Sequence, residues 1–129
     1  MDDTRRLHYL RIALAVFGVV MIVGLYPLMR FWPSGWAWHE GYSDYQFMIV
    51  GVYATLGVFL LRAARDPLAH LSIIWFTVWS SVVHGAVMAV QSFAHAGHRE
   101  HLLGDVPVLF IVALVLAVLT PRGEASTVR

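Results

Sequence analysis

The sequence contains no cysteine and no lysine, and it carries little charge of either sign. Without cysteine the chain can form no disulfide bond, thiolate metal site or catalytic thiol. Only 13% of its 129 residues are charged, and the net charge of +1 gives no basic surface for nucleic acid. The sequence also has no phosphate-binding glycine loop, nucleophile elbow or catalytic-triad order. These absences favour a protein that is not an enzyme.

What the sequence does have is hydrophobic residues, which make up 59% of the chain. Its mean hydropathy is +0.68. Four apolar runs cover residues 12–29, 45–61, 71–93 and 106–119. Runs of this kind span a lipid bilayer as helices, although the last, at about 21 Å, is shorter than the hydrocarbon core. The sequence therefore predicts one all-α domain, a bundle of four transmembrane helices. A polar tail at residues 122–129, expected to be mobile, follows it.

The arginines predict the orientation of this bundle. With four spans, seven of the nine arginines fall on one side of the membrane: Arg5, Arg6, Arg11, Arg62, Arg65, Arg122 and Arg129. Only Arg30 and Arg99 fall on the other side. Cytoplasmic loops carry an excess of basic residues, so we expect both termini in the cytoplasm of a bacterium and the protein in its inner membrane. The loops around residues 30–44 and 94–105 then face outward.

The third apolar run carries a polar stripe. On a helical wheel, five residues fall within about 60° of one direction. They are Thr77, Ser80, Ser81, His84 and Gln91. An ionisable residue near the bilayer midplane, such as His84, is a functional-site hypothesis by default. Two interpretations stay open: a polar seam that joins helices, with Tyr53 and Thr55 as partners on the second run, or a proton relay, ligand pocket or metal site.

A second cluster of candidate residues lies on the outward side. His95, His98, His101 and Asp105 would share one face of an α-helix, and His39 and Glu40 of the other loop could complete a site. Imidazole and carboxylate suit zinc, and imidazole also suits copper. The alternatives are a solvated loop and, for Asp105, a helix N-cap. A b-type haem is disfavoured, because the two histidines of matching depth, His8 and His70, lie at exposed helix ends.

Three strings in the second half of the chain resemble a known family. They are GVYATLGVFLLRAARDP (Gly51 to Pro67), IWFTVWSSVVHGAVMAVQ (Ile74 to Gln91) and HLLGDVP (His101 to Pro107). They resemble a bacterial family of small four-helix membrane proteins of unknown function, and the layout is distantly similar to that of DoxX-type proteins. The resemblance covers about residues 43–122. It implies a four-helix membrane fold and carries no activity, cofactor or catalytic residue.

Taken together, these patterns favour a small membrane protein that packs against other helices. The expected role is an accessory subunit or homo-oligomer within a membrane assembly, whose partners are the lipid bilayer and neighbouring membrane helices. The alternative is a metal or redox-cofactor site at the outward histidines and carboxylates. A third interpretation is a small proton-coupled carrier that uses His84.

Overall fold

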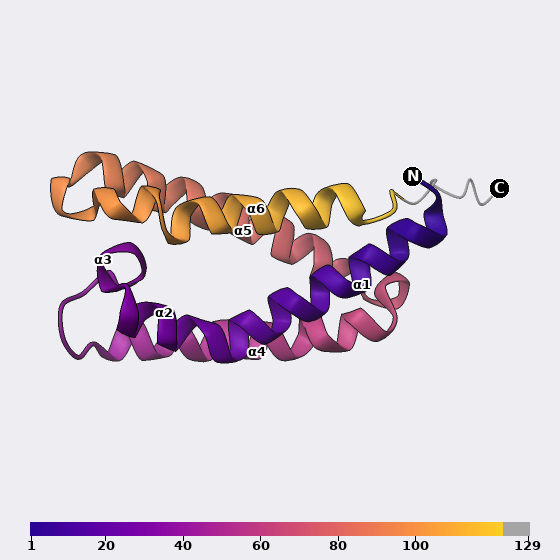
Figure 1. The fold of residues 1–129 in the computed structure, drawn as a ribbon, viewed down its shortest axis with the longest axis horizontal. Coiled ribbons are helices and arrows are strands. Elements are labelled where there is room, and N and C mark those ends of the chain that lie inside the picture. The colour runs from indigo at the N-terminus through magenta and orange to yellow at the C-terminus, as the bar shows by residue number, and fades with distance from the viewer. Residues whose placement is uncertain (123–129) are drawn as a thin grey trace.

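The structure, a computed structural model, describes residues 1–122 as an all-α protein (Figure 1). Four helical segments are long and apolar enough to cross a membrane, which confirms the predicted number of spans and indicates a multi-pass membrane protein. The first segment combines α1 (Asp3–Val19), the π-helical turn η1 (Val20–Gly24) and α2 (Leu25–Phe31). The second is α4 (Asp44–Arg65), the third η2 (Pro67–His70) with α5 (Leu71–Ala94), and the fourth η3 (Ala96–Leu102) with α6 (Asp105–Leu119).

The helices extend beyond the apolar runs of the sequence. The first segment begins at Asp3 rather than at residue 12, and the second continues to Arg65. Backbone hydrogen bonding does not stop where side chains become polar, because polar side chains at a helix end can remain in water while the helix continues. Hydropathy therefore predicted the existence of the helices better than their ends. The predicted mobile tail falls on residues 123–129, outside the described residues.

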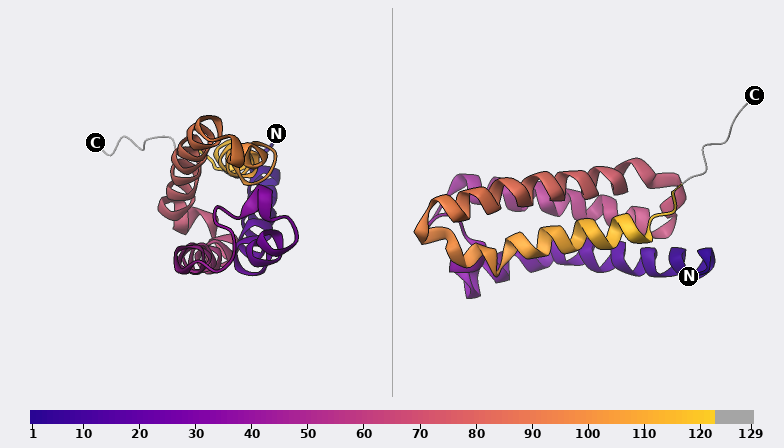
Figure 2. Two further views of the ribbon diagram at one scale, coloured as in Figure 1. Left: turned by 90° about the vertical axis from the view of Figure 1, so that its left-hand side faces the viewer. Right: turned by 90° about the horizontal axis from the view of Figure 1, so that it is seen from above.

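The four segments pack as two antiparallel pairs. Helix α1 packs along α4, and α5 packs along α6, while a smaller contact between α1 and α6 joins the two pairs. Helices α4 and α5 follow each other in sequence but touch little. Viewed along the bundle axis, the helices occupy four corners, and the side between α4 and α5 is the sparsely packed one (Figure 2).

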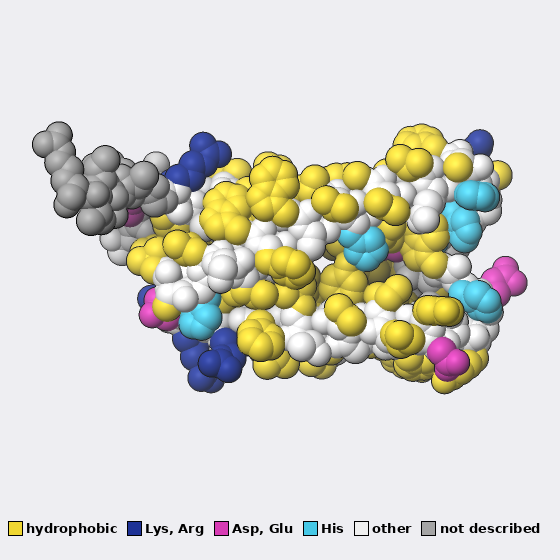
Figure 3. Space-filling model, turned by 180° about the vertical axis from the view of Figure 1, so that it is seen from behind, with side chains coloured by type: hydrophobic (Ala, Val, Ile, Leu, Met, Phe, Trp, Pro, Cys, Tyr) yellow, Lys and Arg dark blue, Asp and Glu magenta, His cyan; other side chains and the backbone are white. Residues whose placement is uncertain are grey.

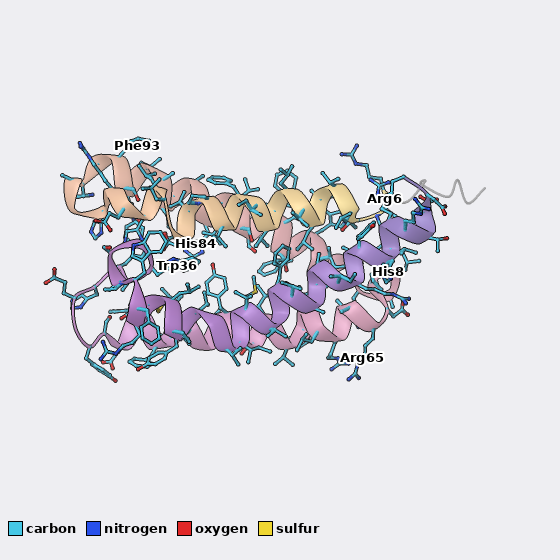
Figure 4. The ribbon with its side chains drawn as sticks, in the orientation of Figure 1. Arg6, His8, Trp36, Arg65, His84 and Phe93 are labelled. Atoms are coloured by element: carbon cyan, nitrogen blue, oxygen red, sulfur yellow. The ribbon has the colours of Figure 1, made fainter. Side chains whose placement is uncertain are left out.

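The end of the bundle where α1 begins and α6 ends is here called the inner end. The main hydrophobic core fills the inner half, where five large apolar side chains are fully buried: Leu10, Leu14, Leu60, Ile74 and Leu116. The guanidinium of Arg6 donates two hydrogen bonds to the carbonyl of Val118, at 3.0 and 2.6 Å. These bonds place the start of the first helix beside the end of the last one, where Arg6 is labelled in Figure 4.

Two glycines bring the backbones of α1 and α4 into contact. A Cβ on Gly57 would lie 2.6 Å from the carbonyl oxygen of Gly18, and a Cβ on Gly18 would lie 2.8 Å from that of Gly57. Small residues allow this approach between membrane helices, where backbone proximity strengthens packing. The two glycines thus form a close contact between two helices of the same chain, and α1 and α4 are tightly packed against each other.

The first helix changes its winding above this contact. The π-helical turn η1 lies just before Pro27, which has no backbone N–H to donate and whose ring crowds the carbonyl four residues earlier. A wider turn at this place accommodates the proline within a continuous membrane helix. Val20 and Met21 of the turn line the cavity described below.

The opposite end of the bundle, here called the outer end, is closed by a loop. The short helix α3 (Pro33–Trp36) packs on η3. A Cβ on Gly104 would lie 2.3 Å from the carbonyl oxygen of Gly35, so only glycine permits this contact. The hydroxyl of Ser34 also donates a hydrogen bond to the carboxylate of Glu100. The loop that carries three of the five tryptophans is thereby held against the last hairpin.

Candidate functional site

The polar stripe of α5 faces the interior of the bundle over most of its length. Thr77 and Ser81 are buried, and Gln91 lines the cavity described below. The hydroxyls of Thr77 and Ser80 donate to carbonyls of their own helix, those of Ile73 and Thr77. Such bonds satisfy a hydroxyl without any partner helix. The stripe therefore faces the interior of the bundle, but the hydroxyls of Thr77 and Ser80 form no hydrogen bond to another helix among the described residues.

Among the described hydrogen bonds of the stripe, the one made by His84 joins α5 to another helix. Its Nδ1 atom lies 2.5 Å from the phenol oxygen of Tyr53 on α4, and the two rings are stacked. The prediction that Tyr53 is a cross-helix partner is confirmed. The hydroxyl of Thr55, the other predicted partner, donates to the carbonyl of Gly51 in its own helix instead. The Tyr53–His84 bond crosses the sparsely packed side of the bundle.

His98 and His101 lie on the 3₁₀ helix η3, and His95 directly precedes it, so the predicted α-helical geometry is wrong. A 3₁₀ helix has three residues per turn, so side chains three apart line up. Neighbouring rings of His95, His98 and His101 accordingly have centroids 6.2 and 5.7 Å apart. The indole of Trp38 stacks on the rings of His98 and His101, at 4.8 and 4.1 Å between centroids. The histidines thus form a row with an aromatic ring along its inner part.

Asp105 lies at the inner end of this row. Its Oδ1 atom accepts a hydrogen bond from Nδ1 of His101 at 3.0 Å, and its Oδ2 atom accepts one from the indole of Trp38 at 2.9 Å. The N-cap interpretation is wrong, because Gly104 holds the N-cap position and Asp105 is the first residue of α6. The carboxylate instead joins η3 to the outer loop, and both His101 and Asp105 are buried.

The six residues considered for a metal do not come together. Within residues 1–122 no three histidine, cysteine, aspartate or glutamate side chains are arranged to hold a metal ion. Only His101 and Asp105 of the predicted set make a hydrogen bond to each other. His95 turns back to the carbonyl of Gln91, and His39 and Glu40 are exposed. Of the two histidines considered for haem, His70 contacts the carbonyl of Asp66 in its own turn.

A cavity of about 430 Å³ separates the two helix pairs in the outer half of the bundle. Most of its wall is apolar, from α1, η1, α4, α5 and α6. Besides the two indoles of Trp36 and Trp38, eight polar side chains line it: His39, Ser43, Tyr45, Gln46, Tyr53, His84, Gln91 and Asp105. In Figure 4 the labelled side chains of Trp36 and His84 both lie in the space between the pairs. Small-molecule sites have this size and this mixture of apolar walls and few polar groups.

A second hollow, of about 660 Å³, opens at the outer end. Met29, Trp38, His39 and Gln46 line both hollows, so these side chains form the partition between them. Figure 3 shows the apolar surface of the bundle interrupted between the helix pairs, with a histidine at the edge of the depression. The cavity between the helix pairs is therefore closed toward the outer end by the outer loop, and at its side it is bounded by the gap between α4 and α5.

Sequence reasoning missed the two tryptophans that shape the site. Tryptophan near the ends of membrane helices usually forms an aromatic belt at the membrane surface, and the sequence positions of Trp32, Trp36 and Trp38 favour that role. In the structure Trp36 is 8% exposed and lines the cavity, and Trp38 bonds Asp105. The concentration of three tryptophans in seven residues was the available signal.

Comparison with known proteins identifies the family of the chain. A protein-family model matches residues 5–128. The chain belongs to DUF6632, a family of unknown function. No curated protein and no solved structure gives a significant match. Membership in DUF6632 therefore identifies the chain by family, and the function has to be argued from the cavity and its polar groups.

Proposed function

We propose that this DUF6632 member binds a small, mostly apolar molecule from the membrane in the cavity between its two helix pairs. The observation that carries the proposal is the Tyr53–His84 pair, two polar side chains joined at 2.5 Å on the wall of a mostly apolar cavity. Polar groups inside a membrane are costly, so their presence beside a cavity favours a functional role. A packing role alone requires no space beside them.

The shape of the bundle supports entry of such a molecule from the side. Helices α4 and α5 touch little, and large apolar side chains such as Val52 and Val87 are exposed along them. A lipophilic molecule dissolved in the bilayer can reach the cavity through this gap without crossing the outer loop. In the inner half, by contrast, buried aliphatic side chains form the main core.

Filling the cavity tests the proposal. Ile49 of α4 lines the cavity, whereas Val52 lies on the same helix and points to the outside. We expect native mass spectrometry of the protein from its own membrane to show one bound small molecule, lost in Ile49→Trp and kept in Val52→Trp. If the same molecule stays bound in both variants, or none is ever bound, the cavity does not serve as a binding site.

The second candidate function is the packing subunit predicted from the sequence. The exposed gap between α4 and α5 favours it, because a partner helix could cover the gap. The absence of cysteine makes this testable, since a single Val83→Cys variant carries one thiol on the exposed face of α5. Crosslinking to a second membrane protein in cells would support packing. Free reaction with a lipid-soluble maleimide would support the binding role.

We further propose that the inner end faces the cytoplasm of a bacterium and that the histidine row faces outward. The supporting observation is the distribution of arginine: Arg5, Arg6, Arg62, Arg65 and Arg122 lie at the inner end. Reporter fusions after Arg129 and within the loop at Gly97 test this orientation. The proposal requires a cytoplasmic signal from the first and an external signal from the second. The reverse signals would place the cavity in the opposite leaflet.

A further inference from the structure

We infer that the cavity is built for an uncharged lipophilic molecule whose head group accepts hydrogen bonds, such as a ketone or an ester carbonyl. This inference rests on the proposed binding function and names the class of ligand. It follows from the polar hydrogens of the Tyr53–His84 pair and from the position of Asp105 on the cavity wall.

The Tyr53–His84 pair always leaves one donor free. A phenol and a neutral imidazole carry two polar hydrogens between them, and the bond between the phenol oxygen and Nδ1 uses one. If the phenol donates, the hydrogen on Nε2 of His84 remains; if Nδ1 donates, the phenol hydrogen remains. Within residues 1–122 neither side chain makes another hydrogen bond to protein. The pair therefore offers a donor in either arrangement.

The indole of Trp36 does not add a second donor to the cavity. Trp36 lines the cavity, but its indole nitrogen is buried among protein atoms and has no hydrogen-bond partner among the described residues. An atom with almost no accessible surface cannot be reached by an acceptor atom of a bound molecule. The free hydrogen of the Tyr53–His84 pair is therefore the donor that calls for an acceptor in the cavity.

The charge on the wall excludes an anionic acceptor. Asp105 lines the cavity, and it already accepts hydrogen bonds from His101 and Trp38 with its two oxygens. A carboxylate or phosphate head group would be repelled by Asp105 in a medium of low dielectric constant. No arginine lines the cavity to compensate an anion. The remaining acceptors are uncharged ones, and carbonyl oxygens are the commonest in lipophilic molecules.

Saturable binding of a simple ketone tests this class. The probe is radiolabelled 2-tetradecanone, added to the full chain in nanodiscs of diether phosphatidylcholine, which contain no ester carbonyl. Unlabelled ketone should displace the probe, whereas tetradecane, tetradecanoate and tetradecylammonium at equal concentration should not. Displacement by the ammonium or the alkane overturns the inferred class but leaves the binding function intact. Absence of saturable binding by all four compounds overturns the binding function itself.

The affinities of variants for the ketone test whether the pair offers one free donor. Tyr53→Phe and His84→Leu each leave one free hydrogen, so each should weaken ketone binding by less than about threefold, whereas the double variant should weaken it about tenfold. The matched controls Tyr26→Phe and Trp79→Phe alter exposed side chains outside the cavity and should have no effect. Equal losses in controls and cavity variants would overturn the inference.

A phospholipid ester carbonyl has the same chemistry as a free ketone. Repeating the measurement in nanodiscs of diester phosphatidylcholine distinguishes these two sources. Weaker apparent binding of the ketone there identifies the lipid ester as a competitor for the same donors. Unchanged binding identifies a free small molecule as the ligand. Either result supports an uncharged acceptor, and the variants above remain the measurement that can overturn it.

Discussion

The inner and outer halves of the bundle are built from the same four helical segments, but they are stabilised differently. In the inner half, large aliphatic side chains fill the space between helices and the backbones of α1 and α4 touch at Gly18 and Gly57. In the outer half the helix pairs separate around a cavity, and hydrogen bonds such as Tyr53–His84 connect them. The difference indicates that the inner half maintains the fold and that the outer half is available for binding.

The largest expected effect comes from truncating the inner core. Leu60 of α4 is fully buried, so Leu60→Ala should lower the free energy of unfolding by about 2–5 kcal/mol. Ile49 of the same helix borders the cavity and is 45% exposed, so Ile49→Ala should cost less than about 1 kcal/mol. Unfolding by steric trapping in bicelles measures both. Equal losses would show that the two halves are packed alike.

A smaller effect is expected from the backbone contact of the first pair. Gly57→Ala places a methyl group against the carbonyl of Gly18 and should destabilise the protein by about 1–3 kcal/mol. Gly51 lies on the same helix with no heavy atom within 4 Å of an added Cβ. Gly51→Ala should therefore be neutral or stabilising, because alanine favours a helix over glycine. A tolerated Gly57→Ala would mean that α1 and α4 can separate at little cost.

The smallest effect belongs to the hydrogen bond of the outer half. Tyr53→Phe removes the phenol bound to His84 and should cost about 0.6–2 kcal/mol, the range found for side-chain bonds between membrane helices. Tyr26→Phe, at an exposed tyrosine, is the control and should leave the unfolding free energy unchanged. If Tyr53→Phe were as destabilising as Leu60→Ala, the outer half would be essential to the fold.

Much of this architecture could be predicted from the sequence. Helical periodicity and apolar runs predicted four helices and an inward polar stripe, because both depend on local sequence alone. The role of Trp38 could not be predicted, because it depends on a loop more than sixty residues from Asp105 in sequence. The histidine row was placed on the wrong kind of helix, since short stretches with glycine give no clear period. The gap between α4 and α5 depends on how the helices pack, so the hydropathy of the sequence could not predict it.

The connection between α4 and α5 has a mechanical consequence. The short turn η2 joins the two helices at the inner end, the Tyr53–His84 hydrogen bond joins them in the outer half, and α4 extends 22 residues, about 33 Å, away from the turn. A rotation of about 5° at that turn moves the far end of α4 by about 3 Å, the radius of a small head group. On the proposed binding function, we expect the α1–α4 pair to tilt as a unit about η2, because α4 is packed along α1. Entry of a small molecule between α4 and α5 would then require opening of the Tyr53–His84 hydrogen bond and a slight tilt, while the packed inner core stays in place.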